Sequence, residues 1–325
     1  MEFLSNNFIS EFFVVALKWV YSWMNSYPGA IITVTIAIRL LILPLDLRQK
    51  KSARKTAMIQ PKVESLKKRY ANNPQQLQKK QQELYRKEGV KPLAGCLPML
   101  ITLPIFFAFF GAMRVLAAEQ TVAFMLNAQH VGESAFSLPS WLWVNNLWQP
   151  DAGHEQILPT AAKFISFVQT NMSNISPQSV HMLAQSGMLN IDYSAGVYLT
   201  EMADSAGVVG SAIPVYDGLV ADIINYNGLA GRMNGWYILP LLAGGTLFLQ
   251  QKLSMGQNPQ MAQQGKMMLY FFPLFSVYIC ATASTSFALY WLFANLYALA
   301  QLLVLNYIYK MRDKKDKPPV IEEAT

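Results

Sequence analysis

Arg39 is the residue that most constrains the chemistry available to this sequence. It lies inside an apolar run from Ala30 to Leu47, which at about 1.5 Å rise per residue is close to the length that crosses a bilayer. A guanidinium keeps its proton, and placing it at the centre of a membrane costs at least about 2.5 kcal/mol unless water or polar groups surround it. The run therefore predicts a wet, polar cavity at the level of Arg39. The alternative is that the side chain snorkels to the surface, which is easier from a helix end than from its centre.

The other reactive residue types do not form a catalytic or metal-binding pattern. The sequence has no Gly-rich phosphate loop, nucleophile elbow, HExxH motif or pair of carboxylates inside an apolar run. His130, His154 and His181 are far apart, and Cys96 and Cys280 fall in apolar stretches without metal-ligand spacing, where small buried side chains are expected. We expect no catalytic residue, no metal and no cofactor, and therefore a protein that is not an enzyme.

Composition assigns the chain to the membrane proteins. Of 325 residues, 53% are hydrophobic and only 14% are charged, whereas soluble domains carry roughly a quarter of charged residues. The formal net charge of +7 is spread unevenly. Residues 48–91 contain fourteen Lys/Arg and three Glu, while residues 116–235 contain two Lys/Arg and nine Asp/Glu. The segments must therefore be interpreted one by one.

Five stretches are long and apolar enough to be spanning helices, which predicts an all-α integral membrane protein. The predicted spans are 30–47, 93–116, 236–253, 267–283 and 287–309. The earlier stretch 12–24 is interrupted by Lys18 and is rich in tryptophan and tyrosine. We therefore expect residues 1–29 to contain an amphipathic helix that lies in the membrane interface.

The distribution of Lys and Arg predicts the orientation. Loops rich in these residues stay in the cytoplasm, so the basic segment 48–92 is expected there. Residues 1–29 and the acidic segment 117–235 are then outside, and the loop 254–266 and the basic tail 310–325 are inside. The N-terminus is thus predicted outside and the C-terminus in the cytoplasm.

The basic segment is predicted to be a helical hairpin. Pro61 can open one helix, Asn73 and Pro74 indicate a turn, and Gly89 and Pro92 end the second helix. Its cations have two interpretations. They serve only to fix the topology, or they form a docking arm for anionic partners such as lipid headgroups, ribosomal RNA or acidic nascent chains.

The outer segment 117–235 contains no further span. Its aromatic part, 141–148, is expected to rest on the membrane interface. From about Asp151 onward, short helices are expected to pack as a small cap.

Four short motifs resemble those of one family of membrane proteins. They are KPLAGCLPMLITLPIFF at 91–107, QPK at 60–62, LYRKEG at 84–89 and LYWLFANL at 289–296. The first resembles the second core span of the bacterial YidC membrane insertases, of the YidC/Oxa/Alb superfamily. The next two resemble the cytoplasmic hairpin of these proteins, and the fourth resembles their last span. The resemblance covers roughly 25–116 and 236–310. The segment between is much longer than the short connection usual in that family.

The resemblance implies both a fold and a function. The fold has five core helices around a hydrophilic groove that opens to the cytoplasm and sideways to lipid. The function is insertion and folding of membrane proteins in the bacterial plasma membrane, alone or with the Sec translocon. The implied partners are nascent membrane proteins, the Sec translocon, anionic lipids and the ribosome, the last through the basic hairpin and tail.

The resemblance also implies the residues that line the substrate groove. They are Arg39, Thr35, Thr102, Tyr290, Trp291 and Asn295. Arg39 falls where the family carries its groove arginine, and Thr35 lies on the same helical face four residues earlier. Thr102 stands where some members carry a glutamine, and it offers a shorter side chain without an amide.

Two other function classes remain compatible with the residues alone. The first is a transporter or channel for an anion or other small solute, with Arg39 as its selectivity charge. The lack of an internal repeat, with Asp46 the only acid near a membrane core, argues against it. The second is an assembly factor that holds partner helices without inserting them.

Overall fold

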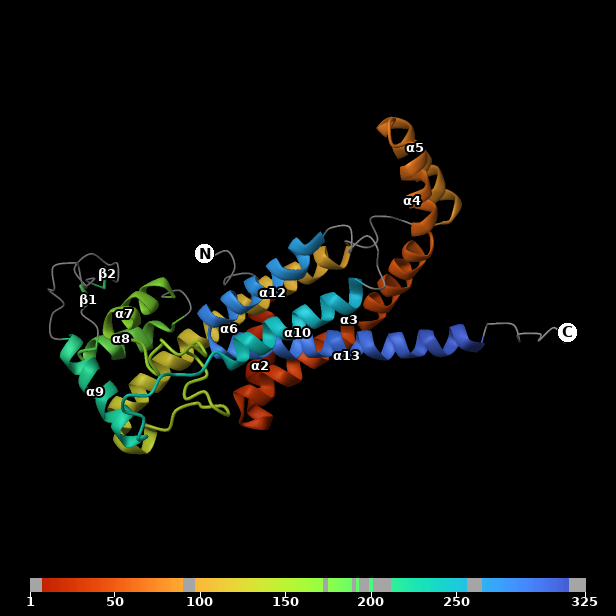
Figure 1. Ribbon diagram of the computed structural model, residues 1–325. Helices are drawn as coiled ribbons and strands as arrows, with labels where there is room; N and C mark the ends of the chain where they lie inside the picture. Colours follow the sequence, from red (N-terminus) through yellow and green to blue (C-terminus); the bar gives the residue numbers. More distant parts are fainter. Residues whose placement is uncertain are drawn as a thin grey trace. The chain divides into compact units, whose positions relative to one another are not determined.

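The computed structural model describes seven stretches of the chain, and most of their residues are helical (Figure 1). The described residues are 8–89, 97–171, 175–188, 191–192, 199–200, 212–255 and 265–315. Cys96, Pro92 and the end of the basic tail lie outside them. The elements are α2 Phe8–Met24, α3 Tyr27–Met58, α4 Gln60–Arg69, α5 Pro74–Lys87, α6 Leu97–Val131, the short 3-10 helix η2 Gly132–Ala135, α7 Ala161–Thr170, α8 Pro177–Gln185, β1 Ile191–Asp192, β2 Leu199–Thr200, α9 Ala212–Tyr226, α10 Ile238–Met255, α12 Gly265–Thr282 and α13 Thr285–Lys315.

Three helices in the described part of the chain are long and apolar enough to cross a membrane. They cover Tyr27–Met58, Leu103–Ala135 and Thr285–Arg312. Leu269–Thr282 is a shorter apolar stretch within α12. An all-α membrane protein is therefore confirmed. The two remaining predicted spans coincide with α10 and α12, of 18 residues each, and their membrane crossing stays a prediction.

The chain forms two compact units, which are described separately. Unit 1 consists of Met1–Val34, Thr102–Leu241 and Val277–Tyr290. Unit 2 consists of Thr35–Ile101 and Leu242–Ser276, together with the residues from Trp291 onward.

In unit 1, the amphipathic helix α2 lies on α6. Leu17 is fully buried, and the ring of Phe13 packs against Phe109 with centroids 5.3 Å apart. Lys18, which interrupts the apolar pattern, pairs with Glu119 of α6 at 2.6 Å. The tryptophans Trp19 and Trp23 remain largely exposed on the other side. This division into a buried and an exposed apolar face is compatible with a position in the membrane interface, which stays a prediction.

The helix α6 continues well beyond the predicted end of the second span at residue 116. Its periodic apolar side chains continue without a helix breaker until Gly132, whose φ of +72° ends it. The extra turns supply one wall of an apolar core that is shared with α7, α8 and α9. We call these three helices and the extra turns of α6 the cap (Figure 1). The sequence predicted a cap of short helices but not this continuous support from α6.

Two of the cap helices begin at well-formed N-caps, and the cap encloses an apolar core. The hydroxyls of Thr160 and Ser176 accept the N–H groups that open α7 and α8. At the centre, Tyr216 is 1% exposed, stacks on Phe164, and donates its hydroxyl proton to the carbonyl of Pro159 at 2.7 Å. Burial raises the pKa of the Tyr216 phenol, so it stays a neutral donor.

Asp151 is a fully buried carboxylate that holds the start of α10. It accepts hydrogen bonds from the indole N–H of Trp143 at 3.1 Å and from the backbone N–H groups of Trp236 and Leu239, each at 2.7 Å. Backbone donors at a helix start have no partner inside the helix, and a carboxylate satisfies them with favourable charge. We call residues 139–159, which carry this group, the junction loop.

Two buried asparagines strengthen the same connection. The backbone N–H of Asn146 donates to Asn234 Oδ1 at 2.7 Å. Asn234 Nδ2 donates in return to the carbonyls of Asn146 and Pro150, each at 2.9 Å. This reciprocal pairing fixes the chain that enters α10 against the junction loop.

The junction loop also holds the start of α13. The backbone N–H of Thr285 donates to the carbonyl of Gln149 at 2.9 Å, and the N–H of Ser286 donates to Leu147 at 3.0 Å. Thr285 adds a hydroxyl hydrogen bond to the Gln149 carbonyl at 2.7 Å. One loop therefore satisfies the first donors of α10 and α13. Part of the aromatic stretch 141–148 is buried in the protein, since Trp148 is only 5% exposed.

Replacing Gly235 by alanine is expected to disrupt this junction. A Cβ at that position would lie 2.0 Å from Asp151 Oδ1, so the carboxylate or the backbone must move. We expect Gly235→Ala to destabilise the protein by about 1–3 kcal/mol, measured as a lower thermal unfolding midpoint in detergent.

Gly218→Ala is the matched control, because this position in α9 has no neighbour within 4 Å of an added Cβ. It should leave the midpoint unchanged or raise it, since alanine favours helix. An equal, small effect of both substitutions would contradict the role assigned to the junction.

Candidate functional site

Unit 2 carries the polar residues of the first predicted span on one face of α3. Thr35 is 1% exposed, and Arg39, one turn later, is half-buried. Asp46 follows on the same face about two turns further along and interacts electrostatically with Arg39. Leu41, on the opposite face, is 81% exposed. The helix therefore has a polar face turned toward protein and an apolar face free to meet lipid.

The guanidinium of Arg39 makes neither a hydrogen bond nor an ion pair with any residue that the structure describes. Its electrostatic neighbours are Asp46, Lys50 and Tyr297, without direct contact at hydrogen-bond distance. A half-buried guanidinium carries several N–H donors, and each needs an acceptor. Water or a bound acidic group must therefore supply the acceptors. This favours the cavity interpretation over complete snorkelling.

Polar contacts from α13 join the other helices of unit 2. The indole N–H of Trp291 donates to the hydroxyl of Ser276 in α12 at 2.6 Å, and Ser276 is 1% exposed. Asn295, 7% exposed, donates from Nδ2 to the carbonyl of Ala243 in α10 at 3.3 Å. These bonds let α13 carry polar side chains inside an apolar helix without leaving them unsatisfied.

Two glutamines of unit 2 have atoms that lack a partner among the described residues. Gln251 Oε1 in α10 and Gln301 Nε2 in α13 are both buried atoms without a hydrogen bond. Buried polar groups of this kind are usually satisfied by ordered water. Sequence reasoning missed these glutamines and Ser276. The available signal was simply a polar residue within or next to a predicted span.

The remaining two predicted groove residues are Tyr290 and Thr102. Tyr290 belongs to unit 1, where its ring stacks on Phe109 with centroids 3.9 Å apart and it is 5% exposed. Thr102 lies in α6, and its side chain is outside the described residues. Within unit 2 the structure thus holds Thr35, Arg39, Trp291 and Asn295. Their joint role as a substrate groove stays a prediction.

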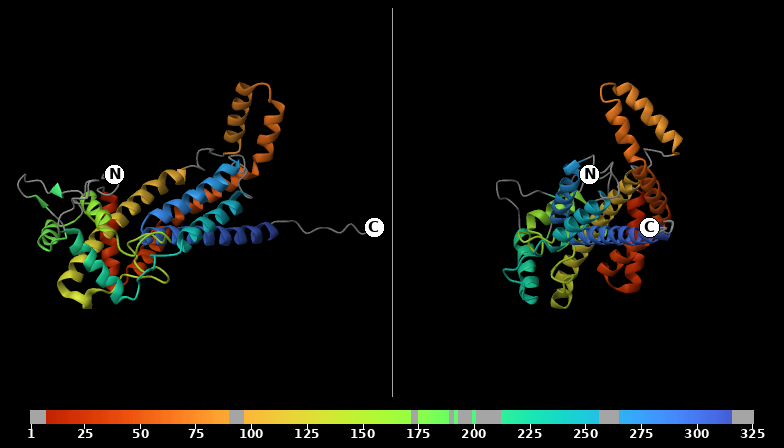
Figure 2. Two further views of the ribbon diagram at one scale, coloured as in Figure 1. Left: turned by 60° about the vertical axis from the view of Figure 1, so that its left-hand side comes forward. Right: turned by 45° about the vertical axis from the view of Figure 1, so that its right-hand side comes forward.

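The basic hairpin leads directly out of α3 (Figure 2). Helices α4 and α5 lie side by side and antiparallel, and Asn73 caps α5 by accepting the N–H of Gln76 at 3.0 Å. Lys62 pairs with Glu88 at 2.6 Å across the open end, and its ammonium lowers the pKa of the Glu88 carboxyl. Gly89, at φ +61°, ends the second helix.

The hairpin keeps most of its cations in contact with solvent. Only its base is well buried, with Val63 at 3% and Ile59 at 5% exposure. Arg54, in the last turns of α3, stacks its guanidinium over the ring of Tyr309 at 4.1 Å and so joins α3 to α13. The arrangement therefore presents positive charge while a small apolar base holds it in place.

Comparison with known proteins assigns the family. A family model described as "60Kd inner membrane protein" matches residues 19–209 and 211–314. The chain belongs to this family. The match is wider than the sequence motifs indicated, because it continues through much of the segment between the second and third predicted spans.

Curated proteins similar to this chain match about half of its length or nearly all of it. A "Membrane protein insertase YidC" of Fusobacterium nucleatum is 34% identical over 172 residues, 52% of this chain and 73% of the relative. A protein of the same name from Oceanobacillus iheyensis is 27% identical over 317 residues, 93% of this chain and 85% of the relative. "Membrane protein insertase YidC 2" of Listeria innocua is 24% identical over 321 residues, 96% and 77% of the two chains. The resemblance to YidC is therefore confirmed, and with its apolar helices the chain is a multi-pass protein of a bacterial membrane.

Proposed function

We propose that this chain inserts membrane proteins into the bacterial plasma membrane and helps them fold, alone or beside the Sec translocon. The observation that carries the proposal is Arg39, a half-buried cation in a candidate span with no hydrogen-bonding partner among the described residues. The proposal is supported by relatives that are named membrane protein insertases. No covalent chemistry is required, since the work consists of moving a segment between solvents.

The first step is attraction of a polar substrate segment toward the membrane interior. Acidic residues near the end of a nascent chain gain a favourable interaction with Arg39, which water and the polar face around Thr35 make accessible. Two unit charges about 4 Å apart attract by about 4 kcal/mol at an effective dielectric constant of about 20. This is comparable to the cost that an isolated carboxylate meets on entering the membrane, about 2.5–3.5 kcal/mol.

The second step is release of the apolar helix of the substrate into lipid. Each Å² of apolar surface moved out of water contributes about 25 cal/mol, so a spanning helix supplies far more than the barrier step consumes. The membrane potential adds about 2.3 kcal/mol per charge per 100 mV for a charge that crosses fully. Attraction to Arg39 must stay modest, because a tightly held tail would not leave.

The proposed orientation places the hairpin where substrates arrive. The basic segments 48–92 and 310–325 are in the cytoplasm, and the N-terminus and the acidic cap are outside, as the charge distribution favours. The exposed cations of α4 and α5 then receive ribosomes, anionic lipids or acidic nascent chains before the span that carries Arg39 does.

Removing the charge of Arg39 is expected to slow insertion of substrates with acidic tails. Arg39→Ala loses the attraction and should lower the initial rate at least about tenfold, which corresponds to about 1.4 kcal/mol. Arg39→Lys keeps a cation and should retain much of the activity. The measurement is protease protection of a single-span substrate in proteoliposomes that contain the purified protein.

The matched substrate has its tail acids replaced by Asn and Gln, and its rate should depend little on residue 39. If Arg39→Ala inserts the acidic-tail substrate as fast as wild type, the electrostatic role is wrong. The same proteoliposomes separate the function classes. Solute flux without insertion indicates a channel, and neither activity indicates an assembly factor.

Neutralising the hairpin is expected to reduce substrate capture without unfolding the helices of the core. Replacing the exposed α5 cations Lys79, Lys80, Arg86 and Lys87 by Gln leaves the buried base at Val63 untouched. Crosslinking of ribosome-bound nascent chains should fall several-fold, with a steeper loss at low salt, because the attraction is electrostatic. Equal crosslinking to the neutralised protein would leave these cations with a topological role only.

A further inference from the structure

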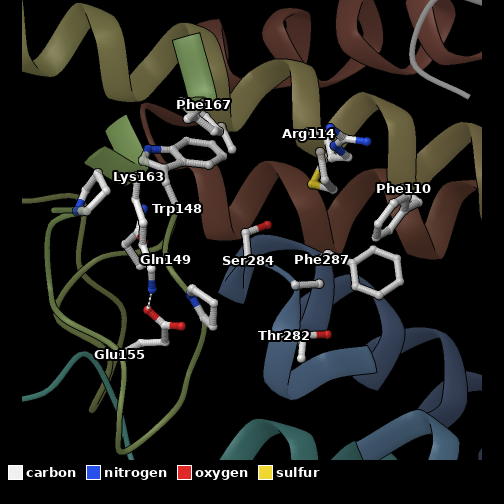
Figure 3. A pocket seen from close by; sticks show the side chains of 15 residues that line it. Phe110, Arg114, Trp148, Gln149, Glu155, Lys163, Phe167, Thr282, Ser284 and Phe287 are labelled. Carbon is white, nitrogen blue, oxygen red and sulfur yellow. Dashed lines mark hydrogen bonds and ion pairs between the residues drawn. The ribbon is translucent and has the colours of Figure 1, made fainter. Parts of the chain in front are cut away.

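The junction loop lies at the level where one span ends and another begins. Gln149 of the loop and Ser284 in the turn before α13 line the same cavity of about 310 Å³ (Figure 3). Ser284 directly precedes the candidate span Thr285–Arg312. Ala117 of α6 also lines the cavity, about twenty residues after the start of α6 at Leu97, which is the length that crosses the hydrocarbon. The loop is therefore at the boundary between hydrocarbon and headgroups on the side of the cap.

The exposed part of the aromatic stretch 141–148 is its turn. The backbones of Trp141 and Val144 exchange two hydrogen bonds of 2.9 Å, which close a two-residue turn. Leu142 occupies the first position of this turn and is 72% exposed. At the other end of the stretch, Trp148 is 5% exposed and faces the cavity (Figure 3). One half of the stretch thus anchors the loop in unit 1, and the other half presents an apolar side chain outward.

Leu142 has an unfavourable backbone conformation. Its φ is +52°, in the left-handed region that leucine rarely adopts and that glycine occupies freely. Hairpin turns with a positive φ at this position usually have glycine there. A strained residue persists only where its surroundings hold it, and such residues cluster at functional positions. A leucine at this exposed turn is explained if its side chain has an apolar environment that the chain itself does not provide.

A second exposed apolar segment is joined to the turn by hydrogen bonds. Asn145, directly after the turn, donates from Nδ2 to the carbonyl of Met233 at 2.9 Å. Asp151 accepts both the indole N–H of Trp143 in the turn and the backbone N–H of Trp236. Met233 is 47% exposed and Trp236 is 75% exposed. Two segments far apart in the sequence therefore form one patch. This patch, which we call the wedge, consists of Leu142, Met233 and Trp236.

Lipid is the environment that fits the wedge. Trp236 stands two residues before the start of α10 at Ile238, and tryptophan is enriched at the ends of spans, where its ring lies among the headgroups. Arg232, directly before Met233, is exposed as well. A basic residue beside exposed apolar side chains is typical of segments that lie in a membrane interface. The position at the membrane boundary and the residue types therefore agree on a lipid surface.

We propose that the wedge inserts into the leaflet on the side of the cap, with Leu142 below the headgroups and Trp236 at headgroup depth. Transfer of these side chains from water to hydrocarbon is favourable because it removes apolar surface from water. The junction loop also holds the first residues of α10 and α13, so the wedge fixes the depth of both helix starts. This role is independent of whether the chain inserts other proteins.

The test measures the depth of single labelled cysteines in proteoliposomes that contain the purified full chain. Cys96 and Cys280 are replaced by Ala, and Leu142→Cys or Trp236→Cys then carries the same fluorophore. Both side chains are largely exposed, so neither substitution should change the unfolding midpoint in detergent. Phosphatidylcholine brominated on its acyl chains should quench the label at 142 several-fold more than a label in water, and the label at 236 to an intermediate degree.

Val131→Cys is the matched control, because Val131 is an apolar cap residue that is 60% exposed and lies about 21 Å further along α6 than Ala117. Iodide in the water on both sides should quench its label, and the brominated lipid should not. Equal quenching of 142 and 131 by the brominated lipid, or equal access of iodide to both, would overturn the proposal. A label at 142 that is protected from both quenchers would also overturn it, because protein, such as a second copy of this chain, then covers the wedge.

Discussion

Hydrocarbon offers no hydrogen-bond partners, so every polar group on the apolar helices must be satisfied by protein or by water. Both units reflect this constraint. In unit 1, Asp151 satisfies the first donors of α10, and the carbonyl of Gln149 satisfies Thr285 at the start of α13. In unit 2, the Trp291–Ser276 bond does the same for side chains within the helices. The structure can therefore carry polar residues at membrane depth without losing its helices.

The charged groups of Arg39 and Asp151 are satisfied in opposite ways, one by exchangeable groups and the other by the protein. The Asp151 carboxylate is fully buried among hydrogen-bond donors of the protein. It contributes to stability, because neither solvent nor a substrate reaches it. Arg39 is only half-buried and lacks direct partners in the described part of the chain, so water or a bound acidic group, both of which can exchange, satisfies its N–H donors. Exchange of water for an acidic tail, and then of the tail for water, is what the role proposed for Arg39 requires.

Short-range patterns in the sequence were sufficient to predict part of the fold and of the candidate site. Arg39 and Thr35 share a helical face because of their spacing, and Asn73 before Pro74 predicted the hairpin turn. Contacts between distant segments could not be predicted in the same way. Nothing near Asp151 indicates that its partners include Leu239, and the extension of α6 to Val131 depends on the cap that covers it.

The most direct test of the account asks which face of α3 a substrate tail meets. A chain with Cys96 and Cys280 replaced by Ala receives one cysteine, at Ile42 on the face of Arg39 or at Leu41 on the opposite, 81% exposed face. A stalled substrate carries a cysteine beside its acidic tail, and disulfide formation between the two is measured. We predict crosslinks at position 42 and few at 41. Equal crosslinking, or crosslinking at 41 alone, would mean that the tail passes along lipid and not past Arg39.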